Sequence, residues 1–226
     1  MKTFRPAIVL VAVIGLLWIA SDNLFPSGSW NYRMTVTVET PEGVKTGSAV
    51  RTVSYKSEAS LFPGQGGRLY SVRGEAVVVD LGRHGLLFGL MYGVCDDFDY
   101  AHLIATSSFP SGEKTAPGAK VILDERQYPM FVRFADLNNP ETVKAVAPQP
   151  GHCGSSCHPD SFETAFGKGV RLKAVEIETT GDPVTALIQT RLPWLATVQG
   201  YLSGKSIGLT GHLYQLLDKG AFKQGN

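Results

Sequence analysis

Polar and apolar residues alternate along residues 30–39, where the apolar phase consists of Trp30, Tyr32, Met34, Val36 and Val38. A period of two is typical of a β-strand with one buried face. The sequence Thr-Pro-Glu-Gly at 40–43 supplies the proline and glycine of a tight turn, and residues 49–55 return with β-branched and aromatic side chains. The pattern therefore predicts a β-hairpin.

A longer apolar stretch, residues 69–81, predicts a strand whose 76–79 segment is buried on both faces. Gly74 inside this stretch indicates a bulge or a bend. A turn at 81–85 leads into a second apolar strand at 86–91. We expect these two strands to lie at the centre of a sheet.

The remaining pattern predicts short elements separated by loops rich in glycine and proline. These are helices at 98–104, after Asn139, at 160–167 and at 193–202, and strands at 119–123, 128–135, 170–179 (with a bulge near Lys173) and 186–189. Strands without βαβ alternation favour an α+β, mostly β fold, in which short helices accompany an antiparallel sheet. One N-terminal transmembrane helix is expected to precede it.

That helix is predicted from residues 7–20, an unbroken apolar run of 14 residues. The run covers about 21 Å, less than a hydrocarbon layer of about 30 Å, but residues 4–25 reach spanning length if Arg5 extends to the headgroups. Cleavage after Ala20 would place Trp18 where a signal peptidase requires a small residue. We therefore expect an uncleaved signal anchor, with a cleaved signal peptide or a buried helix as alternatives.

Charge around the run predicts its orientation. Lys2 and Arg5 precede it and Asp22 follows it, so the positive-inside rule places the N-terminus in the cytoplasm. The expected product is a single-pass inner-membrane protein, in contact with the membrane through residues 4–25. Residues 26–29 would form a linker, and residues 30–226 a single exported domain.

The exported region has no excess of charge. The chain contains 21 Lys and Arg against 20 Asp and Glu, and removing Lys2, Arg5 and Asp22 leaves 19 of each. A nucleic-acid partner would require a basic surplus, so none is expected. No cofactor is expected either: Gly204-Lys205-Ser206 resembles the end of a phosphate-binding loop, but Gly200 is one residue too close, and no Gly-x-Ser-x-Gly elbow occurs.

Cys153 and Cys157 lie in the sequence Gly-His-Cys-Gly-Ser-Ser-Cys-His-Pro. In an oxidising compartment, cysteines four positions apart can form a disulfide if the chain between them turns, and this is our prediction. A zinc site including His152 and His158 is the alternative, although neighbouring residues point apart and a further ligand would be needed. Cys95 is expected to be a buried free thiol.

Acidic residues suggest two further hypotheses. Asp97, Asp99 and His102 partly share a helical face and could form a metal site or an acid–base pair, although an acidic helix start with a solvated histidine is the simpler interpretation. Glu176 and Glu178 share a strand face and could act as paired carboxylates, or could be ordinary solvent-facing residues.

Residues 30–55, 72–88, and 166–185 followed by Leu-Pro-Trp-Leu resemble a group of uncharacterised bacterial envelope proteins, some of which look like lipoproteins. The resemblance implies no activity. This chain departs from it in lacking a lipoprotein cysteine near the anchor and in carrying the insert around Cys153. We expect a membrane-anchored, non-catalytic binding or structural module. The alternative is an envelope hydrolase that uses His and Asp residues, with or without a metal ion.

Overall fold

The computed structural model describes residues 26–57, 67–94, 97–148, 159–202 and 217–225. The chain forms two compact units. The first contains residues 1–29 and 54–71, and the second contains residues 30–53 and 72–226. The predicted anchor at 4–25 lies outside the described residues. Among those described, no helix is both long and apolar enough to cross a membrane.

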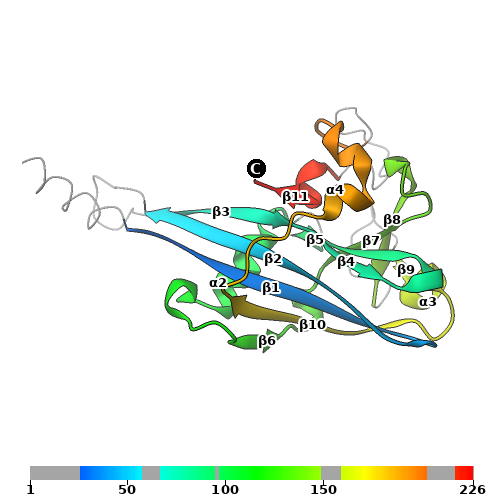
Figure 1. Ribbon diagram of the computed structural model, residues 1–226, viewed down its shortest axis with the longest axis horizontal. Coiled ribbons are helices and arrows are strands. Elements are labelled where there is room, and N and C mark those ends of the chain that lie inside the picture. Colours follow the sequence, from blue (N-terminus) through cyan, green and yellow to red (C-terminus); the bar gives the residue numbers. More distant parts are fainter. Residues whose placement is uncertain (1–25, 58–66, 95–96, 149–158, 203–216, 226) are drawn as a thin grey trace, which may run out of the picture. The chain divides into compact units, whose positions relative to one another are not determined.

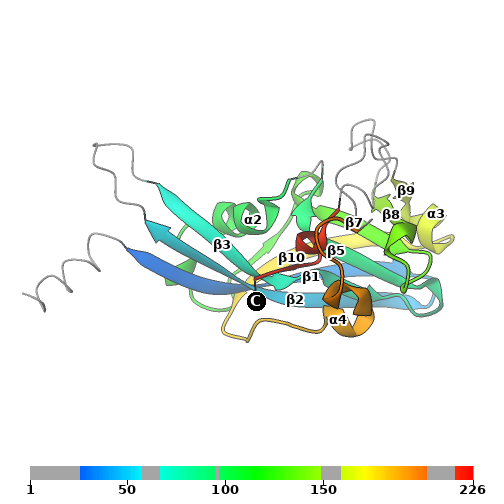
Figure 2. The ribbon, with the colours of Figure 1, turned by 90° about the horizontal axis from the view of Figure 1, so that it is seen from above.

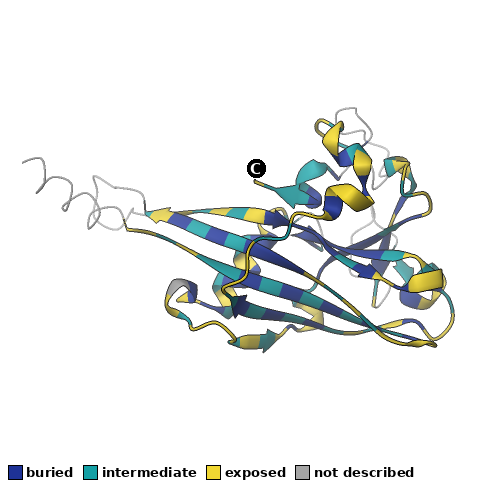
Figure 3. Ribbon diagram, in the orientation of Figure 1, coloured by how far each residue is buried: buried dark blue, intermediate teal, exposed yellow. Residues whose placement is uncertain are grey.

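The first sheet contains six strands. Their order across the sheet is β11 (Lys223–Gln224), β3 (Arg68–Glu75), β2 (Gly43–Ser57), β1 (Ser27–Thr40), β10 (Arg171–Thr180) and β6 (Lys120–Ile122). β1 confirms the predicted alternation, since Tyr32, Met34, Val36 and Val38 are fully buried (Figure 3). It begins at Ser27, within the expected linker. The predicted bulge is also confirmed, because Thr37 and Val38 pair with Ala174 and Leu172 and leave Lys173 between them.

The second sheet contains five strands in the order β4 (Val77–Asp80), β5 (Leu86–Gly93), β7 (Pro129–Phe134), β8 (Val143–Ala147) and β9 (Asp160–Ser161). Its pairs are antiparallel, except that β8 and β9 are parallel. The expected mostly-β fold with short helices is confirmed. One antiparallel sheet was expected, however, and the described strands form two.

The single strand predicted at 69–81 is wrong. β3 ends at Glu75 in the first sheet, and β4 begins at Val77 in the second. Gly74, with φ of +154°, lies at this change of sheet, and the Ala76 amide donates to the Phe222 carbonyl. The predicted bend is therefore present, but β4 lies at the edge of its sheet and not at the centre.

The helices are short. They are α2 (Tyr100–Ser108), α3 (Phe162–Phe166) and α4 (Ile188–Arg191), together with the single 3-10 turns η1 (Gly82–His84), η2 (Gly112–Lys114), η3 (Glu125–Gln127), η4 (Pro140–Thr142), η5 (Pro193–Ala196) and η6 (Lys219–Ala221). The strand predicted at 186–189 is wrong, because α4 begins at Ile188, inside this range, and residues 186 and 187 belong to no strand. The helix predicted at 193–202 is reduced to η5.

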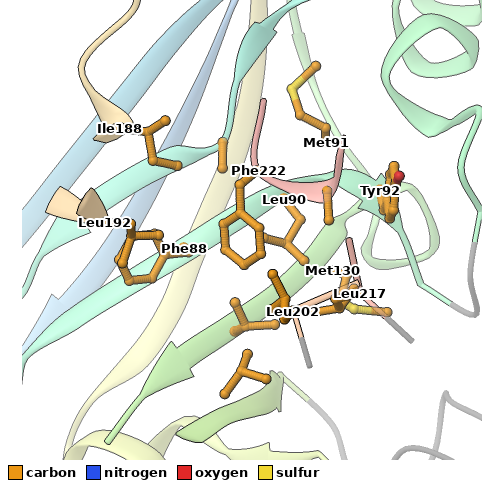
Figure 4. Packing of buried hydrophobic residues seen from close by; sticks show 14 of the residues in the cluster. Phe88, Leu90, Met91, Tyr92, Met130, Ile188, Leu192, Leu202, Leu217 and Phe222 are labelled. Carbon is orange, nitrogen blue, oxygen red and sulfur yellow. The ribbon is translucent and has the colours of Figure 1, made fainter. Parts of the chain in front are cut away.

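Hydrophobic side chains of the second sheet pack against the C-terminal segments of the same unit. Phe88 of β5, Phe134 of β7 and Phe222 form a group of aromatic rings. Leu192, Leu202 and Leu217 belong to the same cluster, and Figure 4 shows them near Phe88 and Phe222. α2 and α4 lie on opposite sides of the first sheet (Figure 2). The chain reaches α4 from β10 by crossing β2, where the Thr185 amide donates to the Val50 carbonyl (Figure 1).

Candidate functional site

The predicted disulfide cannot be compared with the structure. Cys153 and Cys157, the flanking His152 and His158, and Cys95 all lie outside the described residues. The disulfide and the zinc alternative therefore stay predictions.

Asp97, Asp99 and His102 lie at the start of α2, where Asp99 contacts each of the other two residues. An Asp97 carboxylate oxygen accepts a hydrogen bond from the Asp99 amide at 3.2 Å, and His102 Nδ1 lies 3.9 Å from Asp99 Oδ1. Within the described ranges, no three His, Cys, Asp or Glu side chains gather as a metal site requires. The geometry gives the metal hypothesis no support at this place.

Glu176 and Glu178 share one face of β10, as predicted, and both are neutralised by basic neighbours. Lys120 Nζ lies 3.1 Å from Glu176 and 3.6 Å from Glu178, and Arg33 lies 3.7 Å from Glu178. The two carboxylates raise the pKa of Lys120. This arrangement fits a solvent-facing ladder of ion pairs better than a pair of catalytic acids.

A groove of about 470 Å³ in the first unit is a stronger candidate. It is lined by three residues from each of three strands: Ser27, Gly28 and Ser29 of β1, Ser54, Tyr55 and Lys56 of β2, and Leu69, Tyr70 and Ser71 of β3. Since β2 lies between β1 and β3, the lining is continuous across adjacent strands.

The contacts of Tyr55 with Gly28 and Tyr70 indicate the register of the three strands. A Cβ atom on Gly28 would lie 2.7 Å from the Tyr55 ring, and the centroids of the Tyr55 and Tyr70 rings are 6.2 Å apart. Gly28, Tyr55 and Tyr70 therefore form one row across the sheet. Successive residues of a strand point to opposite faces, so the residues on either side of this row share the other face.

That other face carries two rows, Ser29, Ser54 and Ser71, and Ser27, Lys56 and Leu69. Most of these side chains are exposed, and Leu69 has 60% of its surface accessible, whereas Tyr55 has only 7%. These six lining residues share one face of the sheet, and we call them the serine face; Gly28 and Tyr70, on the opposite face, are half-buried.

Aromatic contacts support the serine face from behind. The Arg68 guanidinium carbon lies 4.3 Å from the centroid of the Tyr55 ring, a distance at which a cation is attracted to the π face. The missing side chain of Gly28 leaves room for the same ring. These contacts hold the strand ends together beneath the exposed serines.

The serine face suits a polar ligand. Each hydroxyl can donate one hydrogen bond and accept two, and the short side chains let a ligand approach the sheet closely. Lys56 provides a positive charge beside the hydroxyls, and Leu69 provides an apolar border. A ligand that carries hydroxyl, amide and carboxylate groups matches this surface.

Sequence reasoning missed the serine face because its residues come from three separate stretches of the chain. Ser27 and Ser29 were assigned to the linker, and the register that brings them beside Ser54 and Ser71 is not visible in the composition of any one strand. The available signal was the spacing of two between polar residues at strand ends.

The second unit contains a buried arginine, Arg51, with no exposed surface. Its Nε donates to the Glu75 carbonyl at 3.1 Å, and its Nη2 donates to the carbonyls of Gly89 and Leu90 at 3.4 and 3.3 Å. Its Nη1 has no hydrogen-bond partner among the described residues. Burial raises the pKa of the nearby Tyr32 hydroxyl, an effect that Arg51 partly opposes. Arg51 joins β2 to β3 and β5.

No protein-family model, curated protein or solved structure matches this chain. The resemblance to bacterial envelope proteins therefore stays a prediction.

Proposed function

We propose that the protein is a membrane-tethered module of the bacterial envelope that binds a polar envelope polymer through the serine face. Residues 4–25 would anchor the chain in the inner membrane, and the region after them would lie outside the cytoplasm. Binding, and not catalysis, is the proposed role.

The observation that carries this proposal is the groove itself, whose accessible lining combines serine hydroxyls with the ammonium group of Lys56. Its position in the sequence agrees with a tethered role. Ser27 follows residue 25 by two positions, a distance of at most about 7 Å along an extended chain. A ligand on the serine face would then be held close to the membrane.

Peptidoglycan fits the proposed ligand chemistry, because its strands carry hydroxyl, amide and carboxylate groups. Serine hydroxyls can form hydrogen bonds with the hydroxyl and amide groups of the polymer, and the Lys56 ammonium can attract its carboxylates. The hydrolase alternative would need Asp97, Asp99 and His102 to act together. Among the described residues these three side chains do not form a metal-binding group, so a metal-dependent hydrolase gains no support here.

The proposal is tested by pelleting the full-length protein, in detergent, with purified peptidoglycan sacculi. The wild-type protein should sediment with the sacculi. Ser54→Tyr should reduce the bound fraction at least about fivefold, because Ser54 is on the middle strand of the three and a ring there fills the groove. Ser48→Tyr is the matched control, since Ser48 is an exposed residue of the same strand outside the groove.

Equal sedimentation of the wild type and Ser54→Tyr would contradict the proposed surface. Failure of the wild type to sediment would contradict the proposed ligand. Circular dichroism of each variant checks that the sheet is intact.

A further inference from the structure

A second groove, of about 310 Å³, lies in the second unit. Its lining consists of Arg73 and Gly74 of β3, Lys223, Gln224 and Gly225 at β11, and the segment 183–186 that leads to α4. Two cationic side chains, one on each of two adjacent strands, therefore border the same hollow. We call this the cationic groove.

The register of β3 and β11 places both cations on one face of the sheet. Lys223 pairs with Glu75 and Gln224 pairs with Gly74 in an antiparallel ladder. Arg73 is two residues from Glu75, so Arg73 and Lys223 are diagonal neighbours on the same face. Such neighbours are separated by about 7 Å, a span that one small anion can bridge through two flexible side chains.

Neither cation forms an ion pair with a carboxylate of the described residues. Glu75 is the acidic residue on their face, but only 3% of its surface is exposed. Its two carboxylate oxygens accept hydrogen bonds from the amides of Leu187 and Ile188, at 2.8 and 2.9 Å. Both carboxylate oxygens of Glu75 are therefore already hydrogen-bonded to the backbone at the start of α4.

Further positive charge lies beneath the floor of the groove. A Cβ atom on Gly74 would lie 2.8 Å from Arg51 Cγ, so the stem of the buried Arg51 runs directly under Gly74. Arg51 forms no ion pair within the described part of the chain either. Three cations near one buried carboxylate leave a positive potential, which protein of low dielectric screens weakly.

The backbone also restricts Arg73. Gly225 has φ of +70°, and a Cβ atom there would lie 2.8 Å from Arg73 Cγ and 2.9 Å from Arg73 Cβ. The stem of Arg73 is therefore packed against the chain at Gly225. A packed stem reduces the side-chain entropy that Arg73 would lose on binding an anion.

We propose that the cationic groove binds an oxyanion, the carboxylate or phosphate group of a small ligand, between Arg73 and Lys223. A guanidinium can donate two parallel hydrogen bonds to such a group, and the lysine ammonium adds a point charge. The site is independent of the serine face, so the two proposals can fail separately.

Calorimetric titration of the full-length protein, in detergent at low ionic strength, tests this site with two probes, inorganic phosphate and glutarate. We expect millimolar affinity for at least one probe. Arg73→Gln and Lys223→Gln should each weaken binding about tenfold, and the double variant should abolish it. The control is Arg171→Gln, which changes an exposed arginine paired with Glu39 and should leave binding unchanged.

Binding of both probes supports an oxyanion site of broad use, binding of phosphate alone identifies a phosphate ligand, and binding of glutarate alone identifies a carboxylate ligand. The proposal is overturned if the wild type binds neither probe, or if the double variant binds as tightly as the wild type. Ser54→Tyr should bind the probes like the wild type.

Discussion

At the scale of single residues, Arg51 dominates the interior of the second unit. Arg51 is the largest of the fully buried side chains among the described residues, and it donates hydrogen bonds to the Glu75, Gly89 and Leu90 carbonyls. A buried cation is costly unless its donors find acceptors, and these three carbonyls accept from Nε and Nη2, while Nη1 has no partner among the described residues. One side chain therefore connects segments of both sheets.

Arg51→Ala should destabilise the protein by about 3 to 5 kcal/mol, because it removes these hydrogen bonds and leaves a large cavity. Arg51→Met should cost less, since it retains much of the volume and removes a buried charge. Thermal unfolding of the full-length protein in detergent, followed by circular dichroism, measures both effects.

The control for this comparison is Arg171→Ala, which removes a surface ion pair and should change the free energy of unfolding by less than about 1 kcal/mol. A loss of stability in Arg51→Ala no larger than that of Arg171→Ala would show that Arg51 does not hold the sheets together.

At the scale of elements, the sequence pattern predicted correctly the strands, turns and caps that leave a signal among neighbouring residues. The alternation of β1 and the turn after Thr40 depend on neighbouring residues. The bulge at Lys173 forms against β1, but it leaves a local signal, a change of phase among the apolar residues of β10. The N-cap of η4 is also a local feature, since Asn139 Oδ1 accepts a hydrogen bond from the Glu141 amide two residues later. Each of these features was visible in the sequence because it leaves a pattern within a few positions.

The elements that were predicted wrongly depend on distant partners. α4 begins where Glu75, over a hundred positions earlier, accepts from the Leu187 and Ile188 amides, and nothing near residues 186–189 signals this. The break between β3 and β4 likewise depends on the Phe222 carbonyl. The serine face was missed for the same reason, because it requires the register of three strands.

Gly47 tests the close approach of the two sheets. A Cβ atom there would lie 2.0 Å from the Val78 carbonyl oxygen, so β2 and β4 touch through their backbones. Gly47→Ala should destabilise the protein by at least about 2 kcal/mol, because backbone atoms cannot move aside as a side chain can.

Ser48→Ala, at the neighbouring exposed position, is the control for thermal unfolding and should change stability by less than about 0.5 kcal/mol. If Gly47→Ala unfolds at the same temperature as Ser48→Ala, the backbone contact between β2 and β4 is not present in solution.

At the scale of the whole molecule, the chain combines a predicted anchor at residues 4–25 with a β-rich region that carries two grooves of different chemistry. The serine face belongs to the first unit and the cationic groove to the second. The binding of an envelope polymer by the serine face requires the chain after the anchor to lie outside the cytoplasm, where envelope polymers are present. The location of that region is therefore the central claim.

The most direct test of the central claim is a fusion of alkaline phosphatase, which folds into an active enzyme only outside the cytoplasm, to the C-terminus of the full-length chain in a bacterial host. We predict high phosphatase activity in a membrane fraction that survives washing with alkaline carbonate. An inactive phosphatase, together with fluorescence from a matched cytoplasmic reporter fusion, would contradict the tethered envelope module.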